Sequence, residues 1–554
     1  MPDNDRTPID PQTPEEAVPA PEGATEIIET DYEIGQDNIN FRRRFVFELD
    51  IHNIVFCVSA LGIVAFTLIT LMFQNALGPV FGNLRDFLTN NLDWFFIIAG
   101  NIFVLLCLAL IVLPLGKVRL GGPDATPDYN YVSWFSMLFA AGMGIGLMFY
   151  GVAEPLGNFT AAFAGPTFGP DGARTDWAPL NGYAGDAEGA RRLAMAATIF
   201  HWAIHPWAIY AVVALALALF AFNKGLPLTL RSIFYPIFGE RIWGWPGHLV
   251  DILAVFATMF GLATSLGIGA QQANAGLEFL FGWQSGTGSM IVLIIVITAI
   301  ATASVVSGMD KGVKRLSELN MLLALLLLLF VILAGPTLQI VTGFFKNLLA
   351  YVEYLPALSN PIGRTDDNFR HGWTAFYWAW WISWSPFVGM FIARVSRGRT
   401  VREFLIAVLL IPSLVSTIWM TALGGTAISQ VVTQGLTTVQ DAALELQLFE
   451  MLGHLPLPAI SSLVGIILVV VFFITSSDSG SLVIDTISAG GKVNAPIPQR
   501  VFWATFEGAV AIALLLGGGL TALQAMAVST GFPFAIVLLG ACYALVKGLM
   551  AEPR

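Results

Sequence analysis

The sequence has few charged residues and almost no cysteine, and each shortage argues against a class of protein. Only 12% of the 554 residues are charged, whereas soluble domains have about 25%, and 56% are hydrophobic. The cysteines, Cys57, Cys107 and Cys542, lie in apolar runs without ligand spacing, which argues against a disulfide framework or a metal site. No nucleophile stands with a base, so we expect no enzyme activity, no cofactor and no nucleic-acid partner. The chain is expected in a lipid bilayer.

We also expect no cleavable signal peptide at the amino terminus, because the first apolar run begins only near Ile54. The first 40 residues contain eleven acidic residues and one arginine. This composition predicts a disordered acidic cytoplasmic tail at residues 1–45. The tail also accounts for the formal net charge of -11 and the pI near 5.

Apolar runs long enough to cross a bilayer recur along the chain, since about 20 residues of helix span its core. Twelve such segments are predicted, at 54–73, 94–116, 131–152, 193–222, 248–281, 288–308, 319–345, 373–394, 403–427, 457–480, 501–519 and 523–547. With the amino terminus in the cytoplasm, twenty of the 27 lysines and arginines fall on the inner side. We therefore predict a multi-pass inner-membrane protein with both termini in the cytoplasm.

The third segment contains glycines at 142, 144, 146 and 151. Three glycines in five residues disfavour a continuous helix by roughly 1 kcal/mol each relative to alanine. A packing face of the GxxxG kind is the alternative, but that motif spaces its glycines by four residues rather than two. We favour a broken helix, because half-helix ends at mid-membrane hold substrates and ions in transporters.

The eighth segment contains Pro386 and Gly389, which predict a second bend because proline removes a backbone donor. Five segments separate the third from the eighth, and an odd offset inverts a repeat. We therefore predict an all-α membrane protein of 12 transmembrane helices with two inverted five-helix repeats, spans 3–7 and 8–12, each with a broken first helix. The predicted domains are the tail 1–45, two peripheral transmembrane helices at 46–125, the first repeat at 126–350 and the second at 351–550.

The eighth segment is also dense in aromatic residues, with five tryptophans in the twelve residues that begin at Trp373. Tyr377, Trp380 and Trp384 continue from Trp373 at helical spacing and so share one face. Aromatic faces attract cations, and quaternary ammonium groups are the typical ligand. The fourth segment offers a second wall in His201-Trp-Ala-Ile-His-Pro-Trp-Ala-Ile-Tyr210, for which aromatic helix packing is the alternative.

Two long motifs resemble signatures of the betaine/choline/carnitine transporters: Gly142-Met-Gly-Ile-Gly-Leu-Met-Phe-Tyr-Gly-Val-Ala-Glu-Pro155 and Gly372-Trp-Thr-Ala-Phe-Tyr-Trp-Ala-Trp-Trp-Ile-Ser-Trp-Ser-Pro-Phe-Val-Gly389. The similarity begins near Arg42 and continues to the last span. It implies the inverted-repeat fold, a homotrimer and an aromatic substrate site. The implied substrate residues are Trp202, Trp207, Tyr210, Trp380, Trp381 and Trp384, beside the glycine stretch Gly142, Gly144 and Gly146.

The resemblance further implies a sodium site between the third and tenth segments. Its ligands would be carbonyls of Ala140 and Met143, with Phe472 and the hydroxyls of Thr475 and Ser476. Independently, Phe472-Phe-Ile-Thr-Ser-Ser-Asp-Ser-Gly480 is a polar cluster at the end of an apolar span, and oxygen ligands suit a hard cation. A second implied site would use Thr258, Asn320 and Phe387, although Leu262 stands where the family places another threonine, so one sodium per cycle is expected.

Choline carriers of this family tend to place an aspartate where this chain has Gly146, and its absence leaves room for the carboxylate of a zwitterion. We therefore predict sodium-coupled uptake of a small zwitterionic onium solute, glycine betaine first and dimethylsulfoniopropionate second, ahead of ectoine, proline, carnitine and choline. Proton coupling or exchange of choline or carnitine is the alternative, since His201, His205, Glu154 and Asp478 are ionisable groups near membrane depth. A channel would need rings of carbonyls or charges, for which the sequence shows no pattern.

Overall fold

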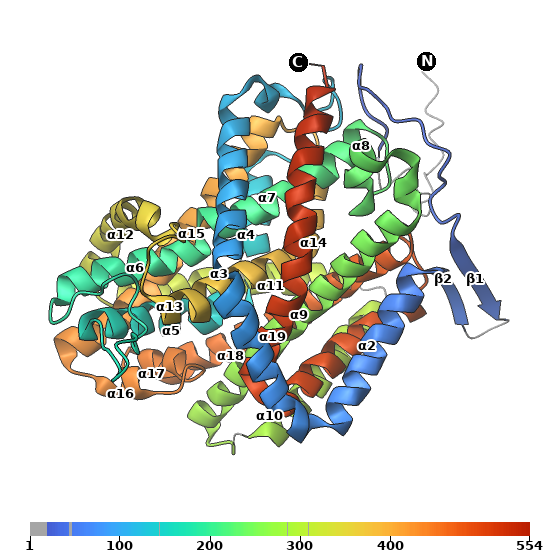
Figure 1. The fold of residues 1–554 in the computed structure, drawn as a ribbon. Helices are drawn as coiled ribbons and strands as arrows, with labels where there is room; N and C mark the ends of the chain where they lie inside the picture. The colour runs from blue at the N-terminus through green and yellow to red at the C-terminus, as the bar shows by residue number, and fades with distance from the viewer. Residues whose placement is uncertain (1–18, 44–46, 143, 285, 308–309, 554) are drawn as a thin grey trace, which may run out of the picture.

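The computed structural model describes residues 19–43, 47–142, 144–284, 286–307 and 310–553, and these are mostly helical (Figure 1). Two antiparallel strands come first, β1 (Asn38–Arg43) and β2 (Phe47–His52). The longer helices are α2 (Val55–Met72), α3 (Gln74–Val112), α4 (Tyr131–Gly142), α5 (Ile145–Ala164), α6 (Ala187–Trp202), α7 (Ile204–Ala218), α9 (Trp245–Phe281), α10 (Thr287–Ser307), α11 (Asp310–Ala334), α12 (Thr337–Leu358), α14 (Phe376–Val395), α15 (Val401–Gln434), α18 (Pro458–Ser488) and α19 (Ile497–Met550).

Short elements connect these helices. They are the 3₁₀ turns Pro114–Lys117, Arg231–Phe234 and Gly239–Trp243, the π-helical turns Leu219–Asn223 and Arg370–Ala375, and the helices α8 (Tyr235–Phe238), α13 (Asp367–Phe369), α16 (Thr437–Asp441) and α17 (Gln447–Gly453). Polar and glycine residues set several helix ends. Thr400 and Glu403 form a reciprocal capping box at the start of α15. The left-handed glycines Gly282 and Gly435 end α9 and α15.

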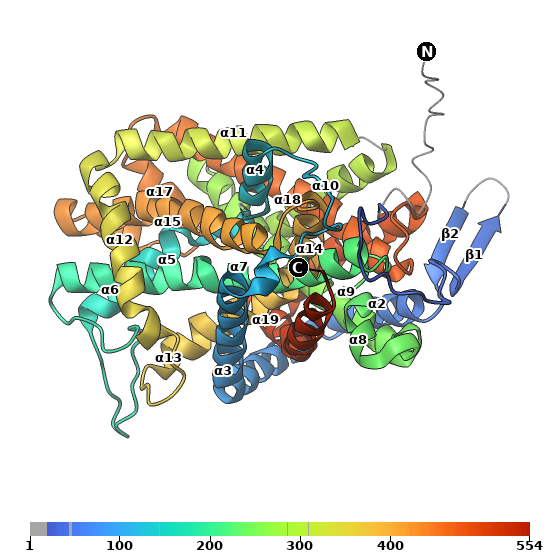
Figure 2. The ribbon, with the colours of Figure 1, turned by 90° about the horizontal axis from the view of Figure 1, so that it is seen from above.

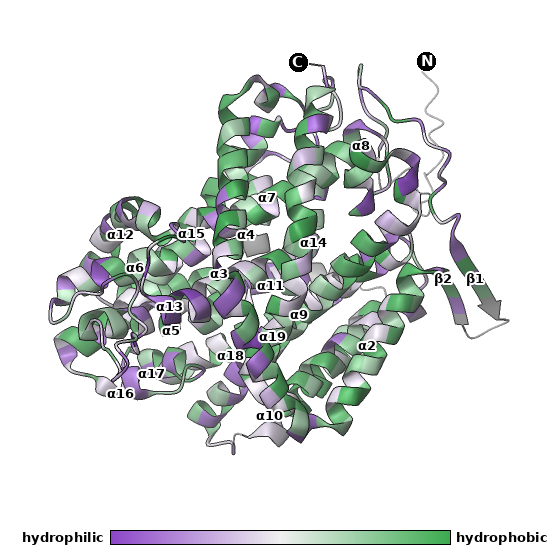
Figure 3. Ribbon diagram, in the orientation of Figure 1, coloured by the Kyte–Doolittle hydropathy of each residue, from purple (hydrophilic) through white to green (hydrophobic). Residues whose placement is uncertain are grey.

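The helices divide into an apolar outer set and a buried inner set. In the most apolar 18-residue windows, 94% of residues are buried in Ala187–Asn223 and 83% in α9, against 33% in α2 and 28% in α11. The outer helices expose leucine, isoleucine and valine, which appear as green ribbon in Figure 3. Exposed apolar faces of this extent on long helices are those expected to contact lipid tails.

Nine helices among the described residues are long and apolar enough to cross a membrane, and each of the twelve predicted segments falls on helical residues. The third segment divides into α4 and α5. The last two lie in α19, which kinks at Gly518 and Gly519, where φ is 160° and 62°. The seventh predicted segment, 319–345, extends beyond the helix that contains its start. Helix α11 ends at Ala334, and α12 begins after Pro336. Twelve spans in two inverted repeats stay a prediction.

The eighth segment has no break at Pro386 and Gly389, because α14 continues through both residues from Phe376 to Val395. The bend predicted there stays a prediction. The Ser385 hydroxyl donates to the Ile382 carbonyl at 2.7 Å, which gives a partner to the acceptor that the missing N–H of Pro386 would have used. A Cβ on Gly389 would lie 2.6 Å from Val213 Cγ1, so this glycine permits close packing of α14 on α7. The irregular stretch lies earlier, in the π-helical turn Arg370–Ala375.

Part of the predicted disordered tail 1–45 is ordered in the described residues. Residues 38–43 form β1, which pairs with β2 beside α2 (Figure 1). The Glu22 amide donates to the Gly121 carbonyl at 2.8 Å, and the Tyr32 ring stacks on Trp243 with centroids 4.2 Å apart. The prediction of disorder rested on acidic composition alone. In the structure, cationic residues elsewhere in the chain form ion pairs with acidic residues of this segment, such as Lys224, which lies 3.3 Å from Glu26.

The inner helices place the site near the middle of the molecule. Figure 2 shows α7, α9, α14 and α18 between α11 on one side and α3 on the other. Helix α14 packs on α7, α9 and α19, and α5 packs on α6, α9 and α15. The broken third segment and the tryptophan-rich eighth segment therefore meet the same group of buried helices.

Candidate functional site: an aromatic cavity at a broken helix

The third predicted segment is interrupted as expected from its glycines. Helix α4 ends at Gly142 and α5 begins at Ile145, with Gly144 extended between them at φ -164° and ψ -174°. Met143 lies outside the described residues. The first N–H groups of α5 have no partners within the helix, so this end carries donors and a partial positive charge.

Side chains from two other helices hold the first turn of α5. The Trp419 indole on α15 donates to the Leu147 carbonyl at 3.0 Å, and the Gln272 amide on α9 donates to the Met148 carbonyl at 2.9 Å. A Cβ on Gly151 would lie 2.8 Å from Trp419 Nε1, which explains the last glycine of the stretch. Sequence reasoning missed Trp419 and Gln272, because nothing local links them to α5.

A cavity of about 850 Å³ opens beside the break. All six predicted aromatic residues line it, together with Gly144 and Gly146. Trp202 is the last residue of α6, Trp207 and Tyr210 lie on α7, and the other three tryptophans lie on α14. The hypothesis that two aromatic walls face one space is therefore consistent with the structure, while the binding roles of these residues stay a prediction.

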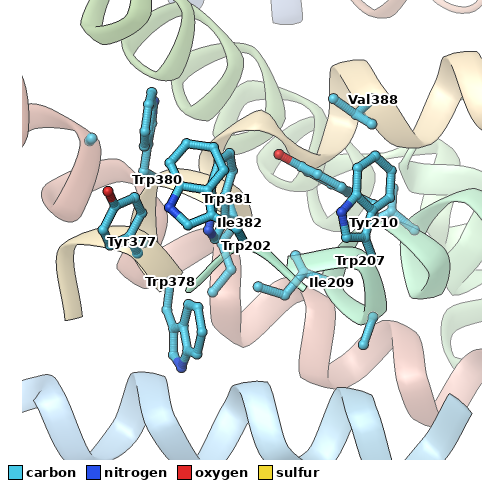
Figure 4. Close-up of a cluster of buried hydrophobic side chains, with 14 of the residues drawn as sticks. Trp202, Trp207, Ile209, Tyr210, Tyr377, Trp378, Trp380, Trp381, Ile382 and Val388 are labelled. Carbon is cyan, nitrogen blue, oxygen red and sulfur yellow. The ribbon is translucent and has the colours of Figure 1, made fainter. Parts of the chain in front are cut away.

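The rings in the wall are packed edge to face and in stacks (Figure 4). The Trp202 centroid lies 5.0 Å from that of Trp381 in an edge-on contact, and Trp380 stacks on Trp381 at 5.0 Å. Tyr210 meets Trp381 edge-on at 6.2 Å. Hydrogen bonds fix two of the indoles, with Trp381 Nε1 donating to the His201 carbonyl at 3.0 Å and Trp380 Nε1 to the Gly261 carbonyl at 3.4 Å.

Two of the three glycines predicted beside the substrate, Gly144 and Gly146, have different surroundings. A Cβ on Gly146 would lie 3.0 Å from Cη2 of both Trp202 and Trp380, so this glycine fills the gap between the two walls. A Cβ on Gly144 would meet no atom within 4 Å. Gly142 ends α4. Of Gly144 and Gly146, Gly146 is therefore the one that lacks room for a side chain.

Behind the aromatic wall lies a buried polar cluster formed by Glu154, His201 and their partners. One Glu154 oxygen accepts bonds from Trp202 Nε1 and the Tyr377 hydroxyl, both at 2.6 Å, and the other lies 2.6 Å from His201 Nδ1. His201 Nε2 lies 2.9 Å from the Thr374 hydroxyl. The second candidate histidine, His205, instead contacts Asn101 at 3.0 Å and stacks on Trp378.

Most of the predicted sodium ligands reach the same cavity. Ala140, Phe472, Thr475 and Ser476 all line it, while Met143 lies outside the described residues. The Thr475 hydroxyl donates to the Val471 carbonyl at 2.9 Å, which leaves its oxygen lone pairs for a cation. The donors at hand are hydroxyls and carbonyls, which fit an alkali cation.

The residues predicted for a second sodium site are only partly brought together. Asn320 and Phe387 line the cavity, whereas Thr258 does not and donates to the Ala254 carbonyl at 2.7 Å. Leu262, one turn after Thr258, packs against Gly480 on α18, since a Cβ on Gly480 would lie 2.3 Å from Leu262 Cδ1. One sodium per cycle stays a prediction.

Beyond Thr475 and Ser476, α18 meets charged residues of α19. Asp478 lies 3.3 Å from Arg500, and the Ser477 hydroxyl donates to Glu507 at 2.8 Å. Glu507 is fully buried and was not singled out from the sequence. A lone glutamate in an apolar run was the available signal.

Comparisons with known proteins agree with this geometry. The model of the betaine/carnitine/choline family transporters matches residues 54–554. A glycine betaine/proline/choline transporter of Vibrio parahaemolyticus is 64% identical over 96% of both chains. The glycine betaine transporter 1 of the same organism is 54% identical over 94% of this chain and 97% of its own. A glycine betaine transporter of Acinetobacter baylyi is 40% identical over 90% of this chain and 73% of its own.

The family match covers the broken helix, both aromatic walls and the polar end of α18. The relatives are carriers rather than catalysts, and the many apolar helices are those of a multi-pass membrane protein. The chain therefore belongs to the betaine/carnitine/choline transporter family and is a membrane transporter, not an enzyme.

Proposed function

We propose that this transporter takes up a small zwitterionic onium solute with sodium, and that glycine betaine is the first candidate and dimethylsulfoniopropionate the second. The observation that carries the proposal is one cavity lined by all six predicted aromatic residues. A quaternary ammonium group cannot donate a hydrogen bond, so aromatic faces are among the few groups that bind it specifically.

The charge of the cavity wall favours a zwitterion over a simple cation. Among the described lining residues Glu318 on α11 is the one that is charged, and the others are aromatic, apolar or neutral polar residues. The start of α5 offers unsatisfied N–H groups near Gly144 and Gly146, which suit the carboxylate of a zwitterion. Rings for the onium group and helix N–H groups for the carboxylate thus lie in one cavity.

The relatives support this class of solute. Three transporters of Vibrio parahaemolyticus have glycine betaine in their names. Two of these three names also include proline and choline, and one of those two includes ectoine as well. We therefore rank proline, ectoine and choline below glycine betaine for this chain. Carnitine follows, since none of these names includes it.

Sodium coupling is supported by the position of the oxygen ligands. Thr475 and Ser476 on α18 line the same cavity as Ala140 on α4. An ion held between these helices would fix the broken segment that also borders the substrate. Binding of each ligand would then favour binding of the other.

We also propose that the chain works as a homotrimer in the inner membrane with both termini in the cytoplasm. The cavity extends to Tyr129 and Ser133 at the start of α4. The loop before α4 contacts the amino-terminal segment, since the Asp124 amide donates to the Glu22 carbonyl at 3.2 Å. In this orientation, the cavity faces the cytoplasm.

A proton-coupled or exchange carrier of choline or carnitine is the second candidate. The buried contact between Glu154 and His201 favours it, because intramembrane ionisable pairs often move protons. The experiment that separates the two measures uptake of labelled betaine, dimethylsulfoniopropionate, choline and carnitine into liposomes. An inward sodium gradient should drive betaine fastest. Uptake driven equally by potassium and sodium, and accelerated by a proton gradient, would favour the second candidate.

A further inference from the structure

Glu154 is an ionisable residue in the core of the molecule, behind the aromatic wall. It lies on α5, eight residues after Gly146, and its side chain is 0% exposed. A buried carboxylate is costly unless hydrogen bonds or a charge stabilise it. The groups around Glu154 must therefore stabilise it.

The partners of Glu154 belong to the aromatic wall itself. The Trp202 indole and the Tyr377 hydroxyl both donate to Oε2 at 2.6 Å. An indole N–H can only donate, so this oxygen acts as an acceptor, as in a carboxylate. Hydrogen bonds to a charged acceptor are about twice as strong as neutral ones. Glu154 therefore links α5 to α6 and α14, which carry the two aromatic walls.

A ring that donates to an anion gains electron density on its face. Bonds in a low-dielectric interior polarise one another, and a cation is bound by the negative face of the ring. Trp202 lines the cavity, and Glu154 does not. The negative charge thus lies behind the indole, away from the space that a solute carboxylate would occupy, yet it acts on the same ring that faces the onium group.

His201 contacts the other oxygen of the carboxylate. Its Nδ1 faces Glu154 Oε1, its Nε2 faces the Thr374 hydroxyl, and its ring lies between Phe369 and Tyr377. The imidazole holds the carboxylate in position without lining the cavity. The cluster therefore has one face toward the aromatic wall, through Trp202 and Tyr377.

We propose that Glu154 is a specificity-determining residue that acts as a remote counter-charge for the onium group through Trp202. The inference rests on the proposed function. It explains how a wall of uncharged rings can favour a cationic group while leaving space for the solute's own carboxylate. Direct contact of a carboxylate with the solute would favour simple cations and repel zwitterions. A charge placed behind the ring favours the onium group through the ring without standing beside the solute's carboxylate.

The test compares each onium solute with its tert-butyl analogue, in which carbon replaces the quaternary nitrogen. Glycine betaine is compared with tert-butylacetate, and choline with the corresponding neutral alcohol. Both members of a pair have the same shape, so the ratio of their affinities reports the positive charge alone. Binding is measured on full-length purified protein in saturating sodium.

The variant Glu154→Gln keeps the shape and an acceptor but removes the charge. We expect the ratio of the affinity for betaine to the affinity for tert-butylacetate to fall by about fivefold. The fall is the contribution that polarisation of the Trp202 ring makes to the cation–π contact. Glu154→Asp, which keeps the anion, should retain more of the ratio. Glu507→Gln is the matched control, because Glu507 is equally buried but contacts Ser477 rather than an aromatic residue. It should leave the ratio unchanged.

The outcomes separate the inference from the proposed function. Equal losses for betaine and its analogue in Glu154→Gln would show a purely structural role and overturn the inference, as would an unchanged ratio. A wild-type protein without preference for the onium member would instead overturn the aromatic-site proposal. If Glu154→Gln fails to assemble, Trp202→Phe carries the test, because it keeps a ring but removes the N–H. The ratio must then fall, and an unchanged ratio would overturn the inference.

Discussion

Gly146 lies where two tryptophan rings leave room for a hydrogen atom and little more. A Cβ there would lie 3.0 Å from Cη2 of Trp202 and of Trp380. Gly144, two residues earlier, has open space and an extended backbone that any residue adopts. The pair therefore offers a matched test of space within one segment.

We predict that Gly146→Ala lowers betaine affinity by about 1–3 kcal/mol, because the rings must move apart to admit the methyl group. Gly144→Ala should leave the affinity within about twofold. Gly146→Asp should raise the ratio of choline to betaine uptake above that of Gly146→Ala, since the added anion attracts a cation and repels a carboxylate. Uptake of both labelled solutes in liposomes measures these effects. Betaine uptake that survives intact in Gly146→Asp would place the solute carboxylate elsewhere.

The tryptophans of α14 form one wall of the cavity. We predict that Trp380→Leu or Trp384→Leu weakens binding of trimethylammonium solutes by about 1–2 kcal/mol, or roughly tenfold, while insertion and assembly persist. Trp94→Leu is a suitable control, because Trp94 on α3 is half exposed and does not line the cavity. Equilibrium binding of labelled betaine measures the effect. Unchanged affinity in both α14 variants would contradict the aromatic-site hypothesis.

At the scale of elements, the end of β2 is joined to the start of α2 by His52. Its Nδ1 accepts bonds from the amides of Ile54 and Val55, both at 3.3 Å, and its ring is fully buried. Burial and then the Arg231 guanidinium lower the pKa of His52 to about 3. The folded element therefore holds this imidazole in its neutral form at neutral pH.

This pKa makes the docking of the β1–β2 hairpin depend on pH. An undocked His52 binds a proton below pH 6.5, whereas the docked form stays neutral until about pH 3. Docking is thus most stable above pH 6.5 and weakens as the pH falls toward 3. Between pH 7 and pH 5 we expect a loss of about 2 kcal/mol.

Proteolysis of residues 19–52 under native conditions measures the docking equilibrium at the two pH values. His52→Asn keeps an acceptor for the amides of Ile54 and Val55 but does not titrate, so its pH dependence over this interval should be smaller by that amount. The same pH dependence in wild type and variant would assign the effect to other groups.

At the scale of the whole molecule, the proposed ion and solute sites draw on helices far apart in sequence. Ala140 on α4, Thr475 on α18 and Trp380 on α14 line one cavity. A ligand bound there changes the free energy of the arrangement of all three helices. Coupling between two ligands is then reciprocal.

We predict that Thr475→Ala combined with Ser476→Ala raises the sodium concentration for half-maximal uptake well above wild type, because a dehydrated ion needs several oxygens at once. Thr505→Ala is the control, since its hydroxyl donates to the Val501 carbonyl of its own helix and it is not among the described residues that line the cavity. Betaine binding curves in sodium and in potassium should differ for wild type and converge for the double variant. Coincident wild-type curves would argue for proton coupling through the Glu154–His201 pair.

The sequence by itself determined the features that are local in the chain. Glycines at two-residue spacing predicted the break between α4 and α5, and tryptophans at helical spacing predicted the wall on α14. Apolar runs located the helices, because a bilayer requires backbone groups to be paired within each helix. The predicted helix boundaries were less accurate where one helix closely follows another, as between Ala334 and Pro336.

Only the tertiary structure decided which distant residues meet. The Ser385 hydroxyl donates to the Ile382 carbonyl, which Pro386 cannot bond. Trp419 reaches α5 because Gly151 leaves it room. Glu154 was an ionisable residue without known partners until folding placed Trp202 and Tyr377 against it. The physical reason is the range of the interactions. Helix formation follows residues within one or two turns, whereas the pairing of a buried polar group depends on whichever helix packs against it.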